Sequence, residues 1–439
     1  MKVMKFGGTS VGTPERMHQV AKLITTDSDP KFVVLSALSG TTNTLVSICH
    51  ALKSGKQDQA QTIIAELLQK YNAFYPSLVK TPESRQQAAQ IIHEHFDFLR
   101  TSVEKVFSEN LEKEILAQGE LLSTQLFAAY LEEEKVSAVL LPALEFMRIN
   151  EENEPDTDFI KSMLKEKLSA QKVYQIYITQ GYICKNSRGG VDNLQRGGSD
   201  YSASLIGAAM DAEEIQIWTD IDGMHNNDPR VVDKTFPVAE LSFDEAAELA
   251  YFGAKILHPS SIRPAQRANI PVRLLNTMQP EAPGTLITEK KGGHEIKAVA
   301  AKDGITAIKI KSSRMLLAYG FLCKIFGVFE KYQTPIDMIT TSEVAVSLTI
   351  DDETHLEAIV AELKAYGDVE IDAGQTIICI VGHMLVNKRG VLKRAMNAVG
   401  DLPVRMVSYG GSRYNISLLI DSNLKKEALN LLNKGLFEL

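Results

Sequence analysis

The 439-residue sequence has few cysteines and no long run of hydrophobic residues. Its four cysteines lie far apart and form no CxxC pair, which argues against a zinc cluster or a disulfide scaffold and fits a reducing compartment. The N-terminus reaches a glycine after six residues, too early for the apolar core of a signal peptide. No apolar run approaches the ~18 residues needed to cross a bilayer. We therefore expect a soluble cytoplasmic protein without a membrane partner.

Positive charge is also in deficit, because 47 Lys and Arg residues against 55 Asp and Glu residues give a net charge of -8. This balance argues against a surface for duplex nucleic acid, although a local basic pocket for a small anion fits it. The apolar fraction of 44% and the charged fraction of 23% exclude disordered, fibrous and low-complexity classes. At roughly 150 residues per domain, the length suggests about three domains.

Short apolar runs alternate with helix-period stretches over the first 290 residues. Between 57 and 75, apolar residues recur at i, i+3 and i+4, which predicts an amphipathic helix. Ser242 with Glu245 forms a capping box that opens a helix through Tyr251. The alternation predicts a three-layer α/β domain with a mostly parallel central sheet. The predicted strands are 3–6, 32–37, 138–141, 173–178, 215–218 and 272–275.

The pattern changes after the polar segment 289–294, which is the best candidate for a linker. Residues 305–439 contain a weak internal repeat at a 70-residue offset, in which GFLCKIF corresponds to GVLKRAM and SLTID to SLLID. Each copy follows a strand–helix–strand–strand–helix pattern, which predicts two tandem α+β domains rather than a solenoid. We place the three domains at 1–290, 305–375 and 376–439.

The opening string KFGGTS places a lysine on a strand, two glycines in the turn and hydroxyls before a helix. Glycines let a backbone approach a phosphate closely, and a helix N-terminus presents N–H groups to an anion. The string is neither a Walker loop nor a dinucleotide fingerprint. Such a turn is often mere folding geometry. However, Lys5 lies at the carboxyl end of its strand, where α/β sheets bind ligands.

Two further turns rich in small residues, 39–43 and 196–200, also precede helices. Either could be a plain helix cap, with Asn43 or Asp200 as the capping residue. Three such turns, two of them with a cation beside the glycines, suit a highly anionic ligand. We interpret that ligand as a nucleotide.

Other charged residues could have either a role at a ligand or a purely structural role. Asp220 ends another strand, and Arg230 lies just beyond in a DPR segment that could equally be a solvated turn. Lys255 could complement the C-terminal dipole of its own helix, and Glu120 could be a first-turn acid. There is no HExxH motif, Ser-His-Asp order or cysteine nucleophile, so hydrolase and metalloprotease functions have little support.

Six ordered motifs resemble those of the aspartokinases, within the amino-acid kinase superfamily: KFGGTS, SALSGTTN, QGELLST, QRGGSDYSA, WTDIDG with NDPRVV, and GAKILHP. The stretch GFLCKIFGVFEKYQTPIDMITTSEVAVSLTID is similar to the first ACT domain of the lysine-sensitive class. The resemblance spans essentially the whole chain. It implies a three-layer αβα kinase domain followed by two ferredoxin-like ACT domains, with a strand from 296–310 completing the second. We expect a monofunctional enzyme without a fused homoserine dehydrogenase.

By this resemblance, the enzyme transfers the γ-phosphoryl group of ATP to the β-carboxylate of L-aspartate. The product, 4-phospho-L-aspartate, enters lysine, threonine and methionine biosynthesis. A carboxylate acceptor is already ionised at neutral pH, so no general base is needed, and charge neutralisation and in-line placement dominate. Mg²⁺ is expected to travel with ATP, held mainly by the phosphates with help from Asp220 and without a dedicated set of protein ligands.

The resemblance also assigns residues. The catalytic residues are Lys5, Asp200 and Lys255. The residues on ATP and its phosphates are Lys5, Gly7, Gly8, Ser10, Thr219, Asp220, His225, Arg230 and Lys255. The residues on aspartate are Thr42, Glu120, Arg196 and Ser199. Among these, Arg196 suits a bidentate grip on the α-carboxylate, and Glu120 would face the ammonium.

In lysine-sensitive relatives, the effector lies between the ACT domains of two subunits. The matching residues here are Met315, Phe321, Leu322, Asp337, Ser342 and Glu343. The two acids favour a basic or zwitterionic amino acid, with lysine as the first candidate, and we expect a homodimer through the ACT domains. For the three apolar residues, a plain hydrophobic core is the alternative explanation.

Four positions depart from the family pattern. Gln195 replaces a glycine before the RGGSD string, and His225 replaces a tyrosine near the adenine or ribose, so both bear on ATP affinity. Leu317 replaces a histidine and Ala318 a serine, which leaves the effector open.

Two alternative functions compete with this interpretation. Another kinase of the superfamily could act on glutamate, carbamate or a nucleoside monophosphate, but a carbamate or UMP site has no α-amino acid for Arg196 and Glu120 to grip. A catalytically inactive amino-acid sensor is the second alternative. The retained Lys5, Asp220 and Lys255 argue against it.

Overall fold

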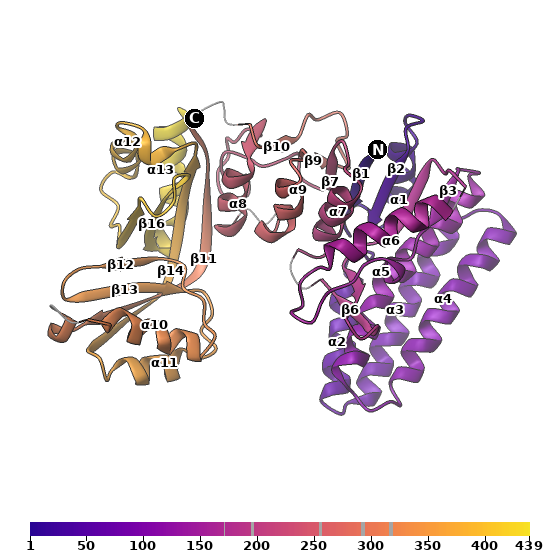
Figure 1. The fold of residues 1–439 in the computed structure, drawn as a ribbon, viewed down its shortest axis with the longest axis horizontal. Helices are drawn as coiled ribbons and strands as arrows, with labels where there is room; N and C mark the ends of the chain where they lie inside the picture. The colour runs from indigo at the N-terminus through magenta and orange to yellow at the C-terminus, as the bar shows by residue number, and fades with distance from the viewer. Residues whose placement is uncertain (171, 195–196, 254–256, 291–294, 316–318) are drawn as a thin grey trace. The chain divides into compact units, whose positions relative to one another are not determined.

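The computed structural model describes the 439 residues except 171, 195–196, 254–256, 291–294 and 316–318 (Figure 1). Contacts divide the chain into two compact units. The N-terminal unit consists of Met1–Met224 and Ile256–Lys290, and the C-terminal unit of His225–Lys255 and Lys291–Leu439. In the described part of the chain, no helix is both long and apolar enough to span a membrane.

A mostly parallel sheet forms the centre of the N-terminal unit. Its strand order within the unit is β3-β4-β2-β1-β7-β9-β10, and only the β9-β10 pair is antiparallel. The strand predicted at 173–178 begins later, because Val173 is exposed and Ile176 is the first residue that pairs with β2. The strands are β1 (Lys2–Phe6), β2 (Lys31–Leu35), β3 (Ala138–Leu140), β4 (Ile176–Gln180), β7 (Ile215–Thr219), β9 (Val272–Asn276) and β10 (Thr285–Thr288). A separate hairpin joins β5 (Ile183–Lys185) and β6 (Val191–Asn193).

Helices cover both faces of this sheet. Met4, Phe6, Val33 and Leu35 face one side and share a buried core with α1 to α5. Lys5 lies between Met4 and Phe6, so it faces the other side, where α7 approaches. The three-layer αβα prediction is therefore confirmed. The helices are α1 (Pro14–Ile24), α2 (Thr41–Lys53), α3 (Gln57–Leu78), α4 (Pro82–Ser102), α5 (Glu109–Glu133), α6 (Thr157–Ala170), α7 (Gly198–Ala209) and α9 (Arg263–Arg267).

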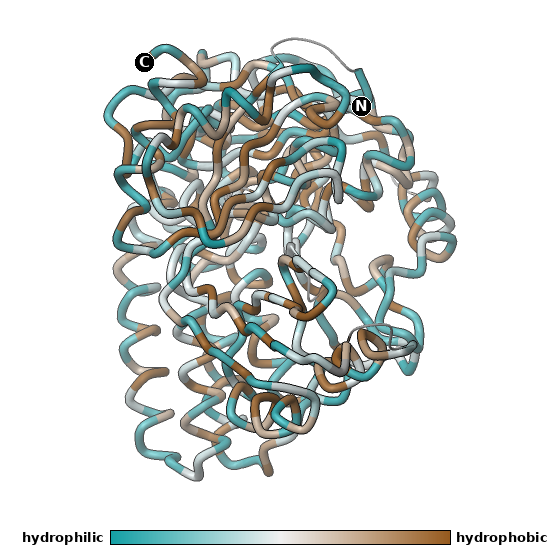
Figure 2. The backbone as a smooth tube through the Cα atoms, turned by 90° about the vertical axis from the view of Figure 1, so that its left-hand side faces the viewer, coloured by the Kyte–Doolittle hydropathy of each residue, from teal (hydrophilic) through white to brown (hydrophobic). Residues whose placement is uncertain are grey.

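The long helices α3 and α4 show why the sequence folds this way. Their buried residues, such as Ile64, Leu67 and Tyr71 of α3, recur at helical spacing, and Figure 2 shows hydrophobic and hydrophilic positions alternating along the long helices. Pro82 and the Thr81 hydroxyl, which accepts a hydrogen bond from the Ser84 N–H, begin α4. The predicted amphipathic helix at 57–75 corresponds to α3.

One antiparallel sheet runs through the C-terminal unit, in the order β12-β13-β11-β14-β16-β15. Strands β11 and β14 pair along almost their whole length. Strand β13 pairs with residues 306–311 of β11, whereas β16 pairs with residues 375–381 of β14. The two long strands therefore serve two ACT-like modules. The strands are β11 (Ile296–Lys311), β12 (Ile339–Thr341), β13 (Ala345–Ile350), β14 (Asp368–Gly382), β15 (Met406–Tyr409) and β16 (Asn415–Asp421).

Each module has its own buried core. In the first module, α10 (Phe321–Lys331) and α11 (Leu356–Leu363) cover the half of the sheet that contains β13. In the second, α12 (Val391–Val399) and α13 (Lys425–Phe437) cover the half that contains β16. This arrangement confirms the prediction of two α+β ACT domains.

Helix α8 (Phe243–Tyr251) belongs to the same unit as these modules. The predicted capping box is present: the Glu245 N–H donates to the Ser242 hydroxyl at 3.2 Å, and the Ser242 N–H donates to the Glu245 carboxylate at 2.7 Å. One turn before its end, Glu248 accepts hydrogen bonds from Ser412 (2.5 Å) and Asn415 (2.6 Å) of the second module. A polar contact thus fixes α8 to the second ACT-like module.

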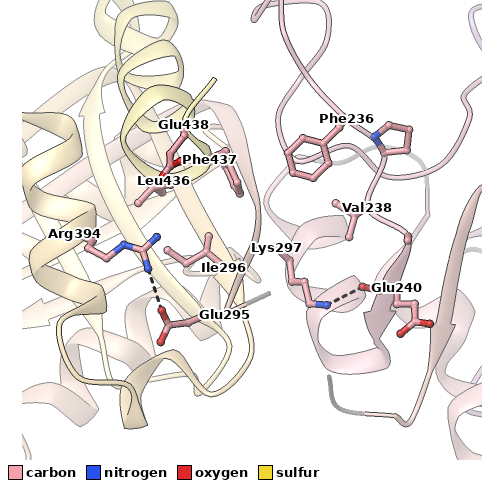
Figure 3. A pocket seen from close by; sticks show the side chains of 12 residues that line it. Phe236, Val238, Glu240, Glu295, Ile296, Lys297, Arg394, Leu436, Phe437 and Glu438 are labelled. Atoms are coloured by element: carbon pink, nitrogen blue, oxygen red, sulfur yellow. Dashed lines mark hydrogen bonds and ion pairs between the residues drawn. The ribbon is translucent and has the colours of Figure 1, made fainter. Parts of the chain in front are cut away.

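A cavity of about 700 Å³ opens in the C-terminal unit, between residues 236–240 and the end of α13 (Figure 3). Its two cations already have partners: Arg394 lies 3.1 Å from the Glu295 carboxylate, and Lys297 donates to the Glu240 carbonyl at 3.1 Å. The cavity therefore offers mainly apolar walls.

At two glycines of the N-terminal unit, substitution by alanine should lower the free energy of unfolding by different amounts. Gly284 has a φ of +66°, and a Cβ there would lie 1.9 Å from the Leu274 carbonyl oxygen, whereas Gly55 has a φ of +70° with open space around it. We expect Gly55→Ala to cost about 1 kcal/mol of unfolding free energy, and Gly284→Ala about 2 kcal/mol more, because its backbone must also shift. Urea denaturation of both variants measures this difference. Equal losses would contradict the close approach at Gly284.

Candidate active site

The carboxyl ends of four neighbouring strands lie at the same edge of the parallel sheet. The register places Phe6 beside both Leu35 and Trp218, and Leu35 beside Gln180. Backbone hydrogen bonds continue past the strand ends, since the Ser36 N–H donates to the Phe6 carbonyl at 3.2 Å. Open α/β sheets bind ligands at this edge. The turns that follow these strands contain most of the predicted site residues.

Lys5 and Asp200 form an ion pair at this edge. The Lys5 ammonium lies 2.6 Å from the Asp200 carboxylate, and the two side chains are only 12% and 14% exposed. The interpretation of Asp200 as a helix cap is wrong, because α7 begins after Gly197, whose φ is +73°. Likewise, α2 begins after Gly40, at φ +80°, so Asn43 is not its cap. The Asp200 carboxylate instead holds Lys5 in position.

Close packing requires glycine at the second of the two glycines after β1, whereas a side chain at the first would meet the Lys5 ammonium. A Cβ at Gly8 would lie 2.9 Å from the Ala37 carbonyl oxygen, and a Cβ at Gly7 would lie 3.4 Å from the Lys5 ammonium. The Gly7 N–H already donates to the Trp218 carbonyl at 3.3 Å. The turn therefore leaves the Lys5 ammonium uncrowded by neighbouring side chains, as a phosphate-binding turn requires.

Ser10 lies deeper in the same turn. Its hydroxyl is buried and lies 2.7 Å from the Thr277 hydroxyl, which follows β9. This contact fastens the turn after β1 to the loop after β9. Ser10 therefore has a structural partner in addition to its predicted role at the phosphates.

Glu120 lies in the interior of α5, so its interpretation as a first-turn acid is wrong. Its side chain is buried, and one oxygen accepts a hydrogen bond of 3.3 Å from the Ala37 N–H. The other oxygen, Oε2, has no hydrogen-bond partner among the described residues. Burial raises the pKa of Glu120 to about 8. A buried carboxyl with one unused oxygen suits a ligand cation.

Serine and threonine hydroxyls connect these charged groups. Ser36 donates to the Ser199 hydroxyl at 2.8 Å, and Ser199 directly precedes Asp200. Thr42 is half-buried in the first turn of α2, beside the turn that follows β2. A Cβ at Gly119 would lie 2.8 Å from the Ala37 Cβ, so α5 packs tightly against this turn.

Two residues near the site were not predicted from the sequence. Ser36 forms the hydroxyl contact just described, and the run of small residues after its strand was the available signal. Tyr182 has a positive φ of +66°, and its N–H donates to the Ser202 hydroxyl at 2.9 Å. Burial, followed by the nearby Glu120, raises the pKa of the Tyr182 phenol to about 12. No sequence motif marks this tyrosine.

The remaining predicted residues have different outcomes. Arg196 and Lys255 are outside the described residues, as is Gln195. Thr219 ends β7 in the N-terminal unit and Asp220 follows it, and the Thr219 hydroxyl donates to the exposed Asp220 carboxylate at 3.0 Å.

The remaining nucleotide-side predictions, His225 and Arg230, belong to the C-terminal unit. His225 Nδ1 lies 2.9 Å from the Thr235 hydroxyl. The Arg230 guanidinium makes two hydrogen bonds to Asp228, at 2.9 and 2.8 Å, while the side chain is 75% exposed. This pair lowers the pKa of Asp228. The geometry is that of a solvated turn.

A protein-only metal centre is not visible in the described part of the chain, where no three His, Cys, Asp or Glu residues gather to hold a metal ion. The exposed Asp220 carboxylate at the sheet edge is nevertheless an oxygen ligand of the type that Mg²⁺ accepts.

The predicted effector residues all lie in the first ACT-like module. Phe321 belongs to its core, and Met315 and Leu322 pack against that core. Ser342 and Glu343 are exposed between β12 and β13. Leu317 and Ala318 lie outside the described residues.

Asp337 differs from the other effector residues, because its side chain is only 1% exposed and pairs with Lys302. It lies just before β12, in the same module.

The raised pKa of Glu120 predicts a pH dependence of stability. The folded protein binds a proton that the unfolded chain releases above about 4.5, so its stability should fall as pH rises towards about 8. The fall should be at most about 1.4 kcal/mol per pH unit. Glu120→Gln should remove this slope, and Glu114→Gln on the same helix should retain it. Urea denaturation between pH 5 and pH 8 compares them. An unchanged slope in Glu120→Gln would show that another group carries the dependence.

Known families match both halves of the chain. Residues 1–276 match the amino acid kinase family, and residues 378–436 match the ACT domain. Lysine-sensitive aspartokinase 3 of Escherichia coli K12 is 33% identical over 452 residues, which cover 99% of both chains. Aspartokinase 3, chloroplastic, of Arabidopsis thaliana is 34% identical over 468 residues, covering 99% of this chain and 81% of the relative.

Solved structures agree with these matches. The E. coli aspartokinase III complex with aspartate and ADP, in the R-state, has a TM-score of 0.85 at 32% identity, with all of both chains covered. The same enzyme with lysine and aspartate, in the T-state, has a TM-score of 0.78 at 32% identity, with 100% of this chain and 99% of that chain covered. The chain therefore belongs to the aspartokinase family, the aspartate kinases among the amino-acid kinases.

Proposed function

We propose that this enzyme transfers the γ-phosphoryl group of ATP to the β-carboxylate of L-aspartate. One observation supports the proposal most directly. A continuous series of contacts links Glu120 through Ala37 and Ser36 to Ser199, and Asp200, the next residue, holds Lys5. An unused carboxylate oxygen and a held lysine are thus connected at the same edge of the sheet. An amino-acid ammonium and a phosphate are the groups that these two ends would bind.

Lys5 would contribute positive charge where negative charge accumulates during transfer. Phosphoryl transfer to a carboxylate brings two anions together, so a fixed cation lowers the barrier by neutralising their repulsion. Asp200 would be a positioning residue that keeps the Lys5 ammonium in one place. Lys255 is proposed as a second cation at the transferred group. The N–H of Gly8 and the hydroxyl of Ser10 would contact the phosphates, with a smaller part for Gly7.

The aspartate ammonium would bind Glu120. A buried carboxyl whose pKa is about 8 gives up its proton readily once an ammonium arrives beside it, because the cation favours the ionised form. Arg196 would hold the α-carboxylate through its two-pronged guanidinium. The hydroxyls of Thr42 and Ser199 would complete the contacts with the substrate.

Thr219, Asp220, His225 and Arg230 would form the nucleotide side of the site. When bound with ATP, Mg²⁺ supplies charge neutralisation of the phosphates. Asp220 is the residue of this chain that would contact it, and the phosphate oxygens would provide most of its ligands.

We further propose that catalysis resides in residues 1–290 and regulation in 305–375 and 376–439, the latter with the strand from 296–310. Lysine would be the feedback effector at an ACT interface between two copies of the chain, through Met315, Phe321, Leu322, Asp337, Ser342 and Glu343. The product would serve cytoplasmic lysine, threonine and methionine synthesis. The sequence similarity of this chain to lysine-sensitive aspartokinase 3 of E. coli supports lysine as the effector.

The test is an assay of ATP and Mg²⁺ with L-aspartate, in which hydroxylamine traps the acyl phosphate as a hydroxamate. We expect hydroxamate with aspartate and little with glutamate. Lys5→Ala should lower kcat by about a hundredfold or more, because a fixed cation is lost from the transferring group. Lys2→Ala, at the other end of β1, should change it little.

Two outcomes would contradict the assignment. Hydroxamate from glutamate but not from aspartate would refute the aspartate pocket around Glu120. A Lys5→Ala enzyme with the native rate would refute the role of Lys5 at the phosphates.

A further inference from the structure

The predicted effector carboxylate Asp337 already has a cationic partner from its own chain. Lys302 donates to its Oδ1 at 2.7 Å, and the Tyr251 hydroxyl donates to the same oxygen at 2.8 Å. The second oxygen, Oδ2, is buried without a hydrogen-bond partner among the described residues. Lys302 and Tyr251 therefore share one oxygen of an enclosed carboxylate whose second oxygen is unused.

Lys302 lies at the point where β11 passes from one ACT-like module to the other. The register of β11 against β14 shifts between Lys302 and Ile305. Its ammonium also lies 2.8 Å from Asp351 and 4.6 Å from the centre of the Tyr251 ring. Burial would lower the pKa of Lys302, but the bonds to Asp337 and Asp351 outweigh it, and the pKa remains above its usual value.

This arrangement is a recognition site for an ammonium group. Two carboxylates and an aromatic face surround one primary amine, and its side chain is only 18% exposed. Carboxylates and aromatic faces are the groups with which proteins bind amino-acid and amine ligands. Here the bound amine belongs to the protein itself.

Tyr251 connects this site to helix α8. It is the last residue of the helix, and two residues later Gly253 adopts a φ of +119°. A Cβ at Gly253 would lie 2.1 Å from the carbonyl oxygen of Ala301, the residue before Lys302. The end of α8 is therefore packed directly against the strand that carries the internal ammonium.

We propose that Lys302 is an internal competitor that occupies Asp337, and that an effector with a cationic side chain must displace it. Tyr251 would pass the displacement to α8. The inference rests on the proposed function, since it takes Asp337 as an effector ligand. Lys302 and the effector ammonium would be alternative occupants of Asp337, because two ammonium groups in contact with one enclosed carboxylate repel each other.

Displacement has two consequences. The apparent affinity for the effector equals the intrinsic affinity multiplied by the fraction of molecules in which Lys302 has left Asp337. In addition, the Tyr251 hydroxyl and the Lys302 ammonium bind the same oxygen of Asp337, so a change of occupant alters the surroundings of the hydroxyl. Only Phe252 separates Tyr251 from the GAKILHP motif in the sequence. The end of α8, which leads to that motif, would thus respond to whether Lys302 or the effector binds Asp337.

The first test measures L-lysine binding by isothermal titration calorimetry to the full-length enzyme. Lys302→Met should bind L-lysine about tenfold more tightly, because the internal competitor is gone. Lys311→Met, on the same strand but paired with Glu370, is the matched control and should stay within about twofold of wild type. Unchanged or weaker binding by Lys302→Met would overturn the proposal.

Lys302→Met leaves Asp337 without its counter-ion, so the variant could fail to fold. Lys302→Arg provides a second test that retains the charge. A guanidinium can bind Asp337 and Asp351 at once, and should therefore weaken L-lysine binding by about threefold or more. Tighter binding by Lys302→Arg would overturn the competition.

The role of Tyr251 in passing the displacement to α8 is tested with Tyr251→Phe, which keeps the ring and removes the hydroxyl. L-lysine should still bind within about threefold, but saturating L-lysine should leave about fivefold more residual kinase activity than in wild type. Tyr409→Phe, whose hydroxyl bonds the Val386 carbonyl in the second module, is the control. Full inhibition of Tyr251→Phe at saturation would overturn the role of Tyr251.

These outcomes separate this inference from the proposed function. Failure of wild type to form aspartyl hydroxamate refutes the kinase assignment. Hydroxamate formation without any binding of L-lysine by wild type refutes the effector, and this inference with it. Normal inhibition of wild type together with unaltered binding by Lys302→Met refutes the displacement alone.

Discussion

The turns after β1 and β2 pass so close together that a Cβ at Gly8 would lie 2.9 Å from the Ala37 carbonyl oxygen. This close approach fixes the backbone that positions the site residues at the edge of the sheet. It aims the Ala37 N–H at Glu120 on α5, and it places Ser36 against Ser199 at the start of α7. Helices from the two outer layers therefore contribute side chains to one place. A small shift of either turn would therefore change the distance between the Glu120 carboxylate and Lys5.

Three enclosed acids in this chain show how the same group acquires different uses from its surroundings. Asp200 has a permanent lysine partner and therefore serves to hold that lysine. Asp337 also has a lysine partner, but one that competes with other donors for an oxygen of the carboxylate. Glu120 has only a backbone N–H, and burial raises its pKa. An acid without an internal cation is costly to ionise in the empty protein, and that cost is relieved when a cationic ligand arrives.

The sequence predicted the layers of the fold well because local patterns determine them. Alternation on β1, helical spacing on α3 and the Ser242–Glu245 box each depend on neighbours a few residues away. The site was predictable where glycines and hydroxyls follow strands, as at Gly8 and Ser199. Other features depend on distant partners and leave no local signal. Glu120 was mistaken for a first-turn acid because the start of α5 was not recognised, and Lys302 was overlooked because its acids lie 35 and 49 residues further along the chain.

The two long strands β11 and β14 have a consequence for how such a protein can change over generations. Each strand begins in one ACT-like module and ends in the other, so neither module has a boundary at which the gene could be cut. Losing the second module would strip β16 from β14 and leave an unpaired edge, which invites aggregation. The pair must therefore be inherited, duplicated or lost as a single piece. Sequence drift can alter what each half recognises, but recombination cannot exchange one half alone.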